Sequence, residues 1–227
     1  VAVVSAMGST TNKLLEQAAR FGPSPDPVGV AALAAIGEAQ SVGLLTLALD
    51  RAGVPANALD HAALGLRTHG PILDAKLDGI DVARVRAALA DRPVLVVPGF
   101  LGRDDLGRTT LLGRGGSDFS ALFIAAKLHC RCVLLKDVDG LYEADPSENP
   151  QARRFESISY DDLLALPEGV VQHKAVRFAK EHGLVFGVGV VGQPVGSLVG
   201  PQATRLASAK REKAKLRVAF LGLGTVG

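Results

Sequence analysis

The sequence predicts an α/β protein in which a mainly parallel sheet is covered by helices on both faces. Apolar runs of strand length alternate with helical patterns along most of the 227 residues, and this alternation is typical of parallel sheets. Apolar residues make up 48% of the chain and aromatic residues only 4%, so Ala, Val, Leu and Gly supply the core. Polar, glycine-rich stretches follow several predicted strands, where ligands bind in such folds.

The first fifty residues predict one buried strand and two helices. The apolar run Val1–Ala6 is typical of a strand that is covered on both faces. A helix is predicted from about Thr11 to Phe21, and Gly22 can end it with a left-handed residue. A longer helical pattern follows over Val28–Ala52 and ends at Gly53.

Shorter elements fill the next stretch. Val54–Leu59 predicts a strand, and the turn-rich segment Leu64–Leu77 predicts a hairpin. Asp81 can cap a helix that continues to Leu89, because Asp is a preferred N-cap residue. The continuous apolar run Pro93–Pro98 predicts a strand that is buried on both faces.

The glycine-rich segment Gly107–Ser120 follows that strand and leads into a helix over Phe119–Leu128. Backbone N–H groups and the dipole of a helix start can bind an anion there. Arg114 can hold a carboxylate or phosphate through two parallel hydrogen bonds, and Ser117 or Asp118 can cap the helix. The same pattern also suits a capped turn that binds nothing, and the pattern alone does not separate these alternatives.

The second half of the chain repeats the alternation. A buried strand is predicted at Cys132–Val138, and Ser159 opens a capping-box pattern for the next helix. A further helix is predicted over Val170–His182 and ends at Gly183. Leu184–Val191 is predicted as the last strand of this unit.

Three polar stretches, MGSTTN, GRGGSD and KDVDGLYEADP, follow predicted strands. Because the carboxyl ends of parallel strands meet at one edge of a sheet, we expect a ligand site there. Glu38 stands in an otherwise apolar helical stretch, where a buried carboxylate needs a partner or a ligand. The alternative is a Glu38 that faces solvent on an amphipathic helix.

Composition argues against several classes of protein. The net charge of +2 and the absence of a basic patch interleaved with aromatic residues argue against nucleic-acid binding. No uncharged apolar run reaches 18 residues, so no membrane span is predicted. Cys130 and Cys132 are expected to be free thiols in a reducing compartment, and no metal site is expected. No P-loop motif GxxxxGK[ST] occurs in the sequence.

The last 27 residues predict a different structure. Residues 201–215 are small, polar and basic, as in a linker, and residues 216–227 combine a strand with Gly222, Gly224 and Gly227. This GxGxxG spacing begins a dinucleotide-binding motif, which lacks here its helix and its acidic residue. Because the chain also begins inside a strand, we expect it to be a fragment of a longer protein.

Together, VVSAMGSTTN, the pair Gly37–Glu38, GRTTLLGRGGSD and LKDVDGLYEADP resemble the kinase domain of aspartokinases, in the amino-acid kinase superfamily. The resemblance covers residues 1–200 and implies a three-layer αβα sandwich. The tail LRVAFLGLGTVG resembles the opening strand of homoserine dehydrogenase, a truncated Rossmann strand. This order of domains is that of the bifunctional aspartokinase–homoserine dehydrogenases.

The resemblance implies an activity and its site. The activity is phosphoryl transfer from MgATP to the side-chain carboxylate of L-aspartate, the first step toward lysine, threonine and methionine. It implies a cytoplasmic homo-oligomer, and NAD(P) would bind only to the full-length parent. The implied substrate residues are Thr11, Glu38, Arg114, Ser117 and Asp118, of which Arg114 and Asp118 are the catalytic candidates.

On the nucleotide side the resemblance implies Asp137, Tyr142 and Asp145, with Tyr142 near the base or ribose. Lys136 stands where many relatives carry Thr, and we assign it to the nucleotide side as well. Arg114 would bind a substrate carboxylate and Glu38 the ammonium. An amino acid, which carries both charges, needs one fixed charge of each sign.

The chain departs from the family pattern at three places. The family's N-terminal strand with its phosphate-stabilising lysine is absent, Ser147 replaces a frequent Arg, and Gly169–Lys174 differs from the family's Lys-Val-Leu-His-Pro helix start. We therefore expect the fragment alone to be inactive. Two alternatives stay open: another amino-acid kinase with a different carboxylate acceptor, and a non-catalytic domain that binds a nucleotide or an amino acid.

Overall fold

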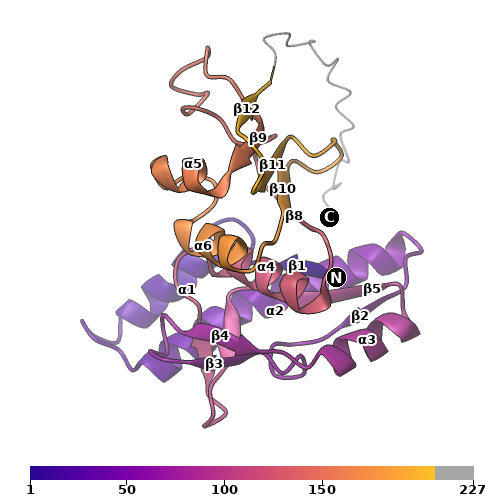
Figure 1. Cartoon of the computed structure of the whole chain (residues 1–227). Coiled ribbons are helices and arrows are strands. Elements are labelled where there is room, and N and C mark those ends of the chain that lie inside the picture. The colour runs from indigo at the N-terminus through magenta and orange to yellow at the C-terminus, as the bar shows by residue number, and fades with distance from the viewer. Residues whose placement is uncertain (208–227) are drawn as a thin grey trace, which may run out of the picture.

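The computed structural model describes residues 1–207 and folds them into six helices and twelve strands (Figure 1). The helices are α1 Thr10–Ala19, α2 Pro27–Arg51, α3 Val82–Asp91, α4 Gly116–Leu128, α5 Tyr160–Ala165 and α6 His173–Glu181. The strands are β1 Ala2–Val4, β2 Ala56–Ala58, β3 Arg67–His69, β4 Lys76–Gly79, β5 Val94–Pro98, β6 Leu101–Arg103, β7 Thr109–Leu111, β8 Cys132–Leu135, β9 Phe155–Ser159, β10 Phe186–Gly189, β11 Ser197–Gly200 and β12 Arg205–Leu206. The predicted dinucleotide motif at Gly222, Gly224 and Gly227 lies outside the described residues.

The strands form three sheets. The first has the order β1-β5-β2 and is entirely parallel, with Val3 opposite Val97. The second has the order β12-β9-β11-β10-β8, in which β10 runs parallel to β8 and β11 to β9, while the β10–β11 pair is antiparallel. The third is the small sheet β4-β3-β6-β7. The predicted α/β class with parallel pairing is confirmed. The antiparallel pairs β3–β4, β6–β7 and β10–β11 join consecutive strands, whereas β12 pairs antiparallel with the more distant β9.

Alternation along β5 shows how helices cover both faces of the first sheet. Val96 packs in a cluster with Val42 of α2, whereas Leu95 and Val97 belong to the cluster that contains Val85 of α3. Successive strand residues point to opposite faces, so α2 and α3 lie on opposite sides of the sheet. This arrangement makes the predicted helix–sheet–helix layers.

A cavity separates the first and second sheets. Strand β1 is the edge of one sheet and β8 is the edge of the other, and residues of both strands line the cavity. Helix α4 contacts both β1 and β8. Figure 1 shows α4 next to β1 of the first sheet, with the second sheet, α5 and α6 above them. The helix therefore bridges the two halves at the position where the site lies.

Helix α2 is long and apolar enough, by length and composition alone, to cross a membrane. In this fold it packs against β1, β2, β5 and β7. Ala31 and Ala34 are fully buried in those contacts, and the same helix buries Glu38. The contacts with two sheets account for the apolar composition of α2.

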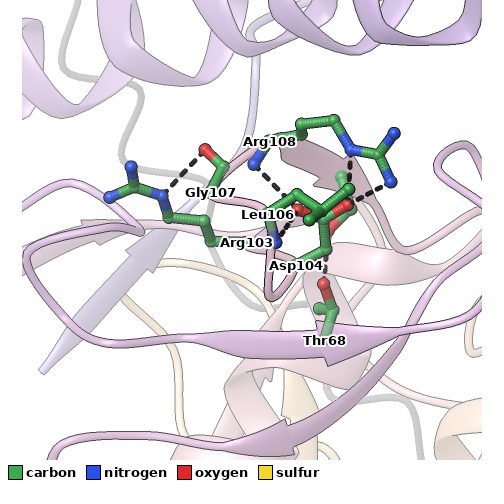
Figure 2. A network of polar contacts seen from close by, with 7 residues as sticks. Thr68, Arg103, Asp104, Leu106, Gly107 and Arg108 are labelled. Carbon is green, nitrogen blue, oxygen red and sulfur yellow. Dashed lines mark hydrogen bonds and ion pairs between the residues drawn. The ribbon is translucent and has the colours of Figure 1, made fainter.

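The hairpin β6–β7 is an element that the sequence analysis did not predict, because it placed the glycine-rich segment directly after β5. Figure 2 shows the hairpin tip, where the Asp104 carboxylate accepts hydrogen bonds from the N–H groups of Leu106 and Arg108 and from the Arg108 guanidinium. Gly107 and Arg108 therefore belong to the hairpin tip, and the part of the segment that leads into α4 as a glycine-rich loop is limited to Gly113–Gly116.

Several predicted boundaries also change. The N-cap of α4 is Gly115 in the left-handed conformation with φ 72°, so the predicted capping by Ser117 or Asp118 is wrong and both lie in the first turn. Helix α6 begins at His173 rather than Val170. Strands β11 and β12 follow the predicted last strand, and β12 pairs with β9 within the stretch predicted as a linker.

Local capping predictions hold where the side chain contacts its own helix. Ser159 accepts a hydrogen bond from Asp162 N–H at 3.0 Å, and Asp81 accepts one from Arg84 N–H at 2.9 Å.

Removing a capping side chain typically costs about 1 kcal/mol. We expect Asp81→Ala to lower the free energy of unfolding by about 1 kcal/mol in urea titrations. The exposed Asp105→Ala should change it little, and equal losses in both variants would contradict the capping role.

Candidate active site

A cavity of about 790 Å³ lies between β1 and β8, at the start of α4. It brings together residues that are far apart in the chain. All five predicted substrate-side residues line it, together with one residue assigned to the nucleotide side: Thr11, Glu38, Arg114, Ser117, Asp118 and Lys136. The structure therefore brings these six side chains together at one cavity, and their role as a ligand site stays a prediction.

Two glycines shape the loop that presents Arg114. Gly113 and Gly115 have φ of 70° and 72°, which non-glycine residues rarely adopt. A Cβ atom at Gly113 would lie 2.2 Å from Asp74 Oδ1, and one at Gly115 would lie 2.5 Å from Gln172 Cγ. The positive φ therefore favours glycine on either side of the arginine, and a Cβ atom there would also displace Asp74 or Gln172.

Arg114 is exposed, and within residues 1–207 its guanidinium has no hydrogen bond or ion pair. It stands immediately before the N-terminus of α4, whose first-turn N–H groups have no acceptors inside the helix. Guanidinium and helix N-terminus both favour an anion. The arrangement suits a carboxylate that enters the cavity from solvent.

Glu38 is buried, with a relative exposure of 1%, so the alternative of a solvent-facing Glu38 is wrong. Its carboxylate accepts a hydrogen bond from Ala6 N–H at 2.9 Å and one from the Ser5 hydroxyl at 3.4 Å. Burial raises the pKa of Glu38 to about 7, against the smaller opposing effect of these hydrogen bonds. A cation bound beside it would lower that pKa and fix the negative charge.

Ser5 connects Ser117 in the first turn of α4 with Glu38 of α2. The Ser117 hydroxyl donates to Ser5 Oγ at 3.0 Å, and the Ser5 hydroxyl in turn points to Glu38. The sequence analysis did not select Ser5. Its position at the carboxyl end of the first predicted strand was the signal that could have found it.

Lys136 follows β8 and faces the first turn of α4. Its ammonium donates to both carboxylate oxygens of Asp118, at 2.7 and 2.8 Å. Its backbone N–H donates to the carbonyl of Gly189 at 2.8 Å, which fixes the end of the strand. The structure thus places Lys136 with the predicted substrate-side residues. Its ammonium group is part of the cavity wall beside the first turn of α4.

The predicted nucleotide residues Asp137, Tyr142 and Asp145 do not line the cavity. The Tyr142 hydroxyl donates to Asp139 Oδ1 at 2.7 Å, and Asp139 also accepts from the Arg154 guanidinium at 3.0 Å.

Asp145 forms a local turn in the same loop. It accepts hydrogen bonds from the hydroxyl and the N–H of Ser147, at 2.6 and 2.8 Å. These bonds lower the pKa of Asp145. Ser147, where the family often has Arg, thus makes only a local contact.

The two cysteines also line the cavity, although sequence reasoning gave them no role there. Both are free thiols, Cys130 exposed and Cys132 buried. Burial raises the pKa of Cys132 to about 12, so this thiol stays protonated and unreactive near neutral pH. Within residues 1–207, no group of three His, Cys, Asp or Glu side chains is placed to hold a metal ion.

Comparison with known proteins gives a consistent family. The model of the amino acid kinase family matches residues 1–185. An aspartokinase of Thermus thermophilus is 40% identical over 190 residues, which is 82% of this chain and 47% of that protein. The chain thus spans about half the length of this curated relative.

Solved structures agree with the sequence comparison. The aspartate kinase from Synechocystis superposes with a TM-score of 0.74 at 33% identity, covering 88% of this chain and 34% of that one. E. coli aspartokinase III, solved in complex with aspartate and ADP, gives a TM-score of 0.68 at 27% identity over 84% of this chain and 44% of its own. The UMP kinase from Bacillus anthracis, at 16% identity and a TM-score of 0.60, shares the fold alone.

Proposed function

The chain belongs to the amino acid kinase family, and on that premise we propose that it is the kinase part of an aspartate kinase. The reaction is transfer of the γ-phosphoryl group of MgATP to the side-chain carboxylate of L-aspartate, which gives 4-phospho-L-aspartate. One observation carries the choice of substrate: the Arg114 guanidinium and the Glu38 carboxyl group, which a bound ammonium would keep charged, line the same cavity. The aspartokinase relatives support it.

In this proposal each side chain has a defined role. Arg114 and the N-terminus of α4 bind a carboxylate of aspartate, and Glu38 binds its ammonium. Thr11 and Ser117 complete the polar wall. Phosphoryl transfer needs positioning and charge stabilisation more than covalent help from the protein.

Asp118 and Lys136 would act where the phosphoryl group arrives. Their ion pair holds the ammonium of Lys136 beside the first turn of α4, where it can offset the negative charge that gathers during transfer. Exchanging Lys136 for a neutral residue would leave the largely buried carboxylate of Asp118 unpaired, which is costly. The pair is therefore assigned a catalytic and a structural task.

MgATP supplies the phosphoryl group, and we assign its nucleotide part to the loop of Asp137, Tyr142 and Asp145. The residues fit a Mg²⁺ that is held mainly by phosphates with one or two carboxylates, because such a site needs no cage of protein ligands. Asp137 and Asp145 are exposed carboxylates on that loop. They are the side chains that can meet the ion.

Two other functions compete with this proposal. Another amino-acid kinase with a different carboxylate acceptor would use the same two charges, whereas an acceptor that is purely a phosphate would not need Glu38. A non-catalytic nucleotide- or amino-acid-binding domain is favoured by Ser147 and by the altered segment Gly169–Lys174, which remove side chains that the family pattern has on the nucleotide side.

We further propose that these residues belong to a cytoplasmic, homo-oligomeric, bifunctional protein of lysine, threonine and methionine biosynthesis. The support is the GxGxxG spacing of Gly222, Gly224 and Gly227, which resembles a homoserine dehydrogenase. Residues 1–200 would be the kinase domain, and residues 216–227 would begin the NAD(P)-binding domain. NAD(P) would bind only to the complete dehydrogenase.

ADP release in the presence of L-aspartate tests the proposed activity. We expect aspartate-dependent release from the bifunctional parent, much less with N-acetyl-L-aspartate, which lacks the ammonium, and little with L-glutamate. The 227-residue chain alone should be nearly inactive, and adding a strand that carries the family's phosphate-stabilising lysine should restore turnover. If the parent shows no aspartate-dependent turnover, the kinase proposal fails and the binding-domain alternative gains.

A further inference from the structure

Lys174 on α6 reaches across to the glycine-rich loop. Its ammonium donates to the carbonyl of Leu112 at 2.5 Å and to Asp74 Oδ1 at 3.2 Å. It also lies 5.5 Å from the centroid of the Phe119 ring in α4. Three segments that are distant in sequence therefore meet at one ammonium group, which is directly next to the loop that carries Arg114.

The loop is enclosed from both sides at this point. Asp74 lies over Gly113 and Gln172 lies over Gly115, so closely that a Cβ atom at either glycine would force these side chains to shift. Lys174 connects the two sides, because it lies in the first turn of α6, whose N-cap residue is Gln172, and binds Asp74 as well as the loop. Arg114 stands between the two enclosed glycines, so its backbone position depends on this enclosure.

The start of α6 is itself held in place. His173 N–H donates to Glu168 Oε1 at 2.8 Å, and the His173 ring lies 3.1 Å from the carbonyl of Leu166. Phe178, one turn further along α6, packs edge-on against Phe119 with ring centroids 5.1 Å apart. Lys174 therefore extends from a fixed helix and not from a loose surface segment.

We propose that Lys174 is a positioning residue, which holds the Gly113–Gly116 loop, and with it Arg114, in the geometry that binds the substrate carboxylate. The ammonium–carbonyl bond fixes Leu112, the residue before Gly113, and a hydrogen bond to a charged group is stronger than one between neutral groups. The substrate part of this inference rests on the proposed aspartate kinase function. The loop-ordering part does not.

Hydrogen exchange of the loop amides tests the ordering. Three amides report on it, because Leu112 N–H donates to Phe100, Gly116 N–H to Gly113 and Phe119 N–H to Gly115. In Lys174→Met, which keeps the aliphatic stem, we expect these amides to exchange at least tenfold faster, and Lys174→Arg should restore most of the protection. The matched control is Lys180→Met, also on α6, which removes the ion pair between Lys180 and Asp161 of α5.

Substrate kinetics of the parent protein give the second readout. Lys174→Met should raise the KM for L-aspartate about tenfold and leave the KM for ATP within about twofold, while Lys180→Met should change neither. Unchanged loop exchange in a folded Lys174→Met protein would overturn the inference even if the kinase is active. Faster exchange in a protein without aspartate turnover would leave the inference standing and refute the proposed function.

A second variant keeps the test valid if Lys174→Met does not fold. Asp74→Asn removes only the carboxylate partner and leaves the bond between Lys174 and the Leu112 carbonyl. We expect loop exchange to rise about threefold in this variant. If loop exchange and the melting temperature of Asp74→Asn both equal those of the wild type, the ion pair of Lys174 with Asp74 does not hold the loop at Gly113, which would count against the inference.

Discussion

Replacing Arg114 by alanine is expected to raise the KM for L-aspartate about 100-fold and to leave the KM for ATP within about threefold. The guanidinium has no partner within residues 1–207, so the substitution removes a ligand contact and little of the fold. A charge-assisted, two-pronged contact with a carboxylate contributes up to about 3 kcal/mol, which corresponds to this change. Steady-state kinetics of the full-length protein measure both constants.

The matched control for this prediction is Arg177→Ala. Arg177 is exposed on α6, and its removal changes the net charge by the same amount. Kinetics of the control should match the wild type. Equal increases of both KM values in Arg114→Ala would show that the loop does not discriminate between aspartate and ATP, and would contradict the assignment of Arg114 to the amino acid.

The second large effect is a pH-dependent gain in stability from Glu38→Gln. The pKa of Glu38 is about 7 in the folded protein and 4.5 in the reference state. Between these values the folded state binds more protons than the unfolded state, so this carboxyl makes the protein less stable as the pH rises through that range. Above pH 7 the loss is complete and amounts to at most about 3 kcal/mol.

Glutamine has nearly the same shape as glutamate and no charge, so Glu38→Gln removes this loss of folding stability. We expect Glu38→Gln to be more stable than the wild type by up to about 3 kcal/mol at pH 8 and by less than about 1 kcal/mol at pH 5. Urea unfolding at the two pH values measures the difference. The exposed Glu16→Gln on α1 is the control, and an equal effect of Glu38→Gln at both pH values would refute the pKa assignment.

The same substitution should impair binding of the amino acid. A bound ammonium holds Glu38 in its charged form, so in the wild type the KM for L-aspartate should fall as the pH rises through about 7. Glu38→Gln should have a much higher KM at pH 8 and lose this pH dependence. A variant that is more stable but less active is expected where a buried charged group binds the ligand and destabilises the fold.

Local chemistry made part of the fold predictable. The caps at Asp81 and Ser159 follow from side chains that bond to N–H groups three residues away, and such contacts are visible in the sequence. The N-cap of α4 was not predictable in this way. Ser117 and Asp118 are good capping residues, but the enclosure of Gly115 by Gln172 selects a glycine in the left-handed conformation.

Contacts across the chain account for what sequence patterns missed. The hairpin β6–β7 consists of three-residue strands joined by turn residues, and nothing in their composition separates them from the glycine-rich loop that follows. The resemblance implied Glu38, Arg114 and Asp118 as site residues, and the structure places all three at one cavity. Their partners Ser5 and Lys136, and the reach of Lys174 to Leu112, follow from tertiary packing that no local pattern encodes.

The hydrogen bond between Ser117 and Ser5 has a consequence for how the protein folds. It joins residues 112 positions apart in the chain, and the parallel pairing of β1 with β5 spans a similar distance. Closing such long loops costs entropy before the contact is gained, and chains rich in these contacts fold slowly. We therefore expect the cavity between β1 and β8 to be among the last parts to assemble, after the core of α4 and α6, and the first to be lost when β1 detaches.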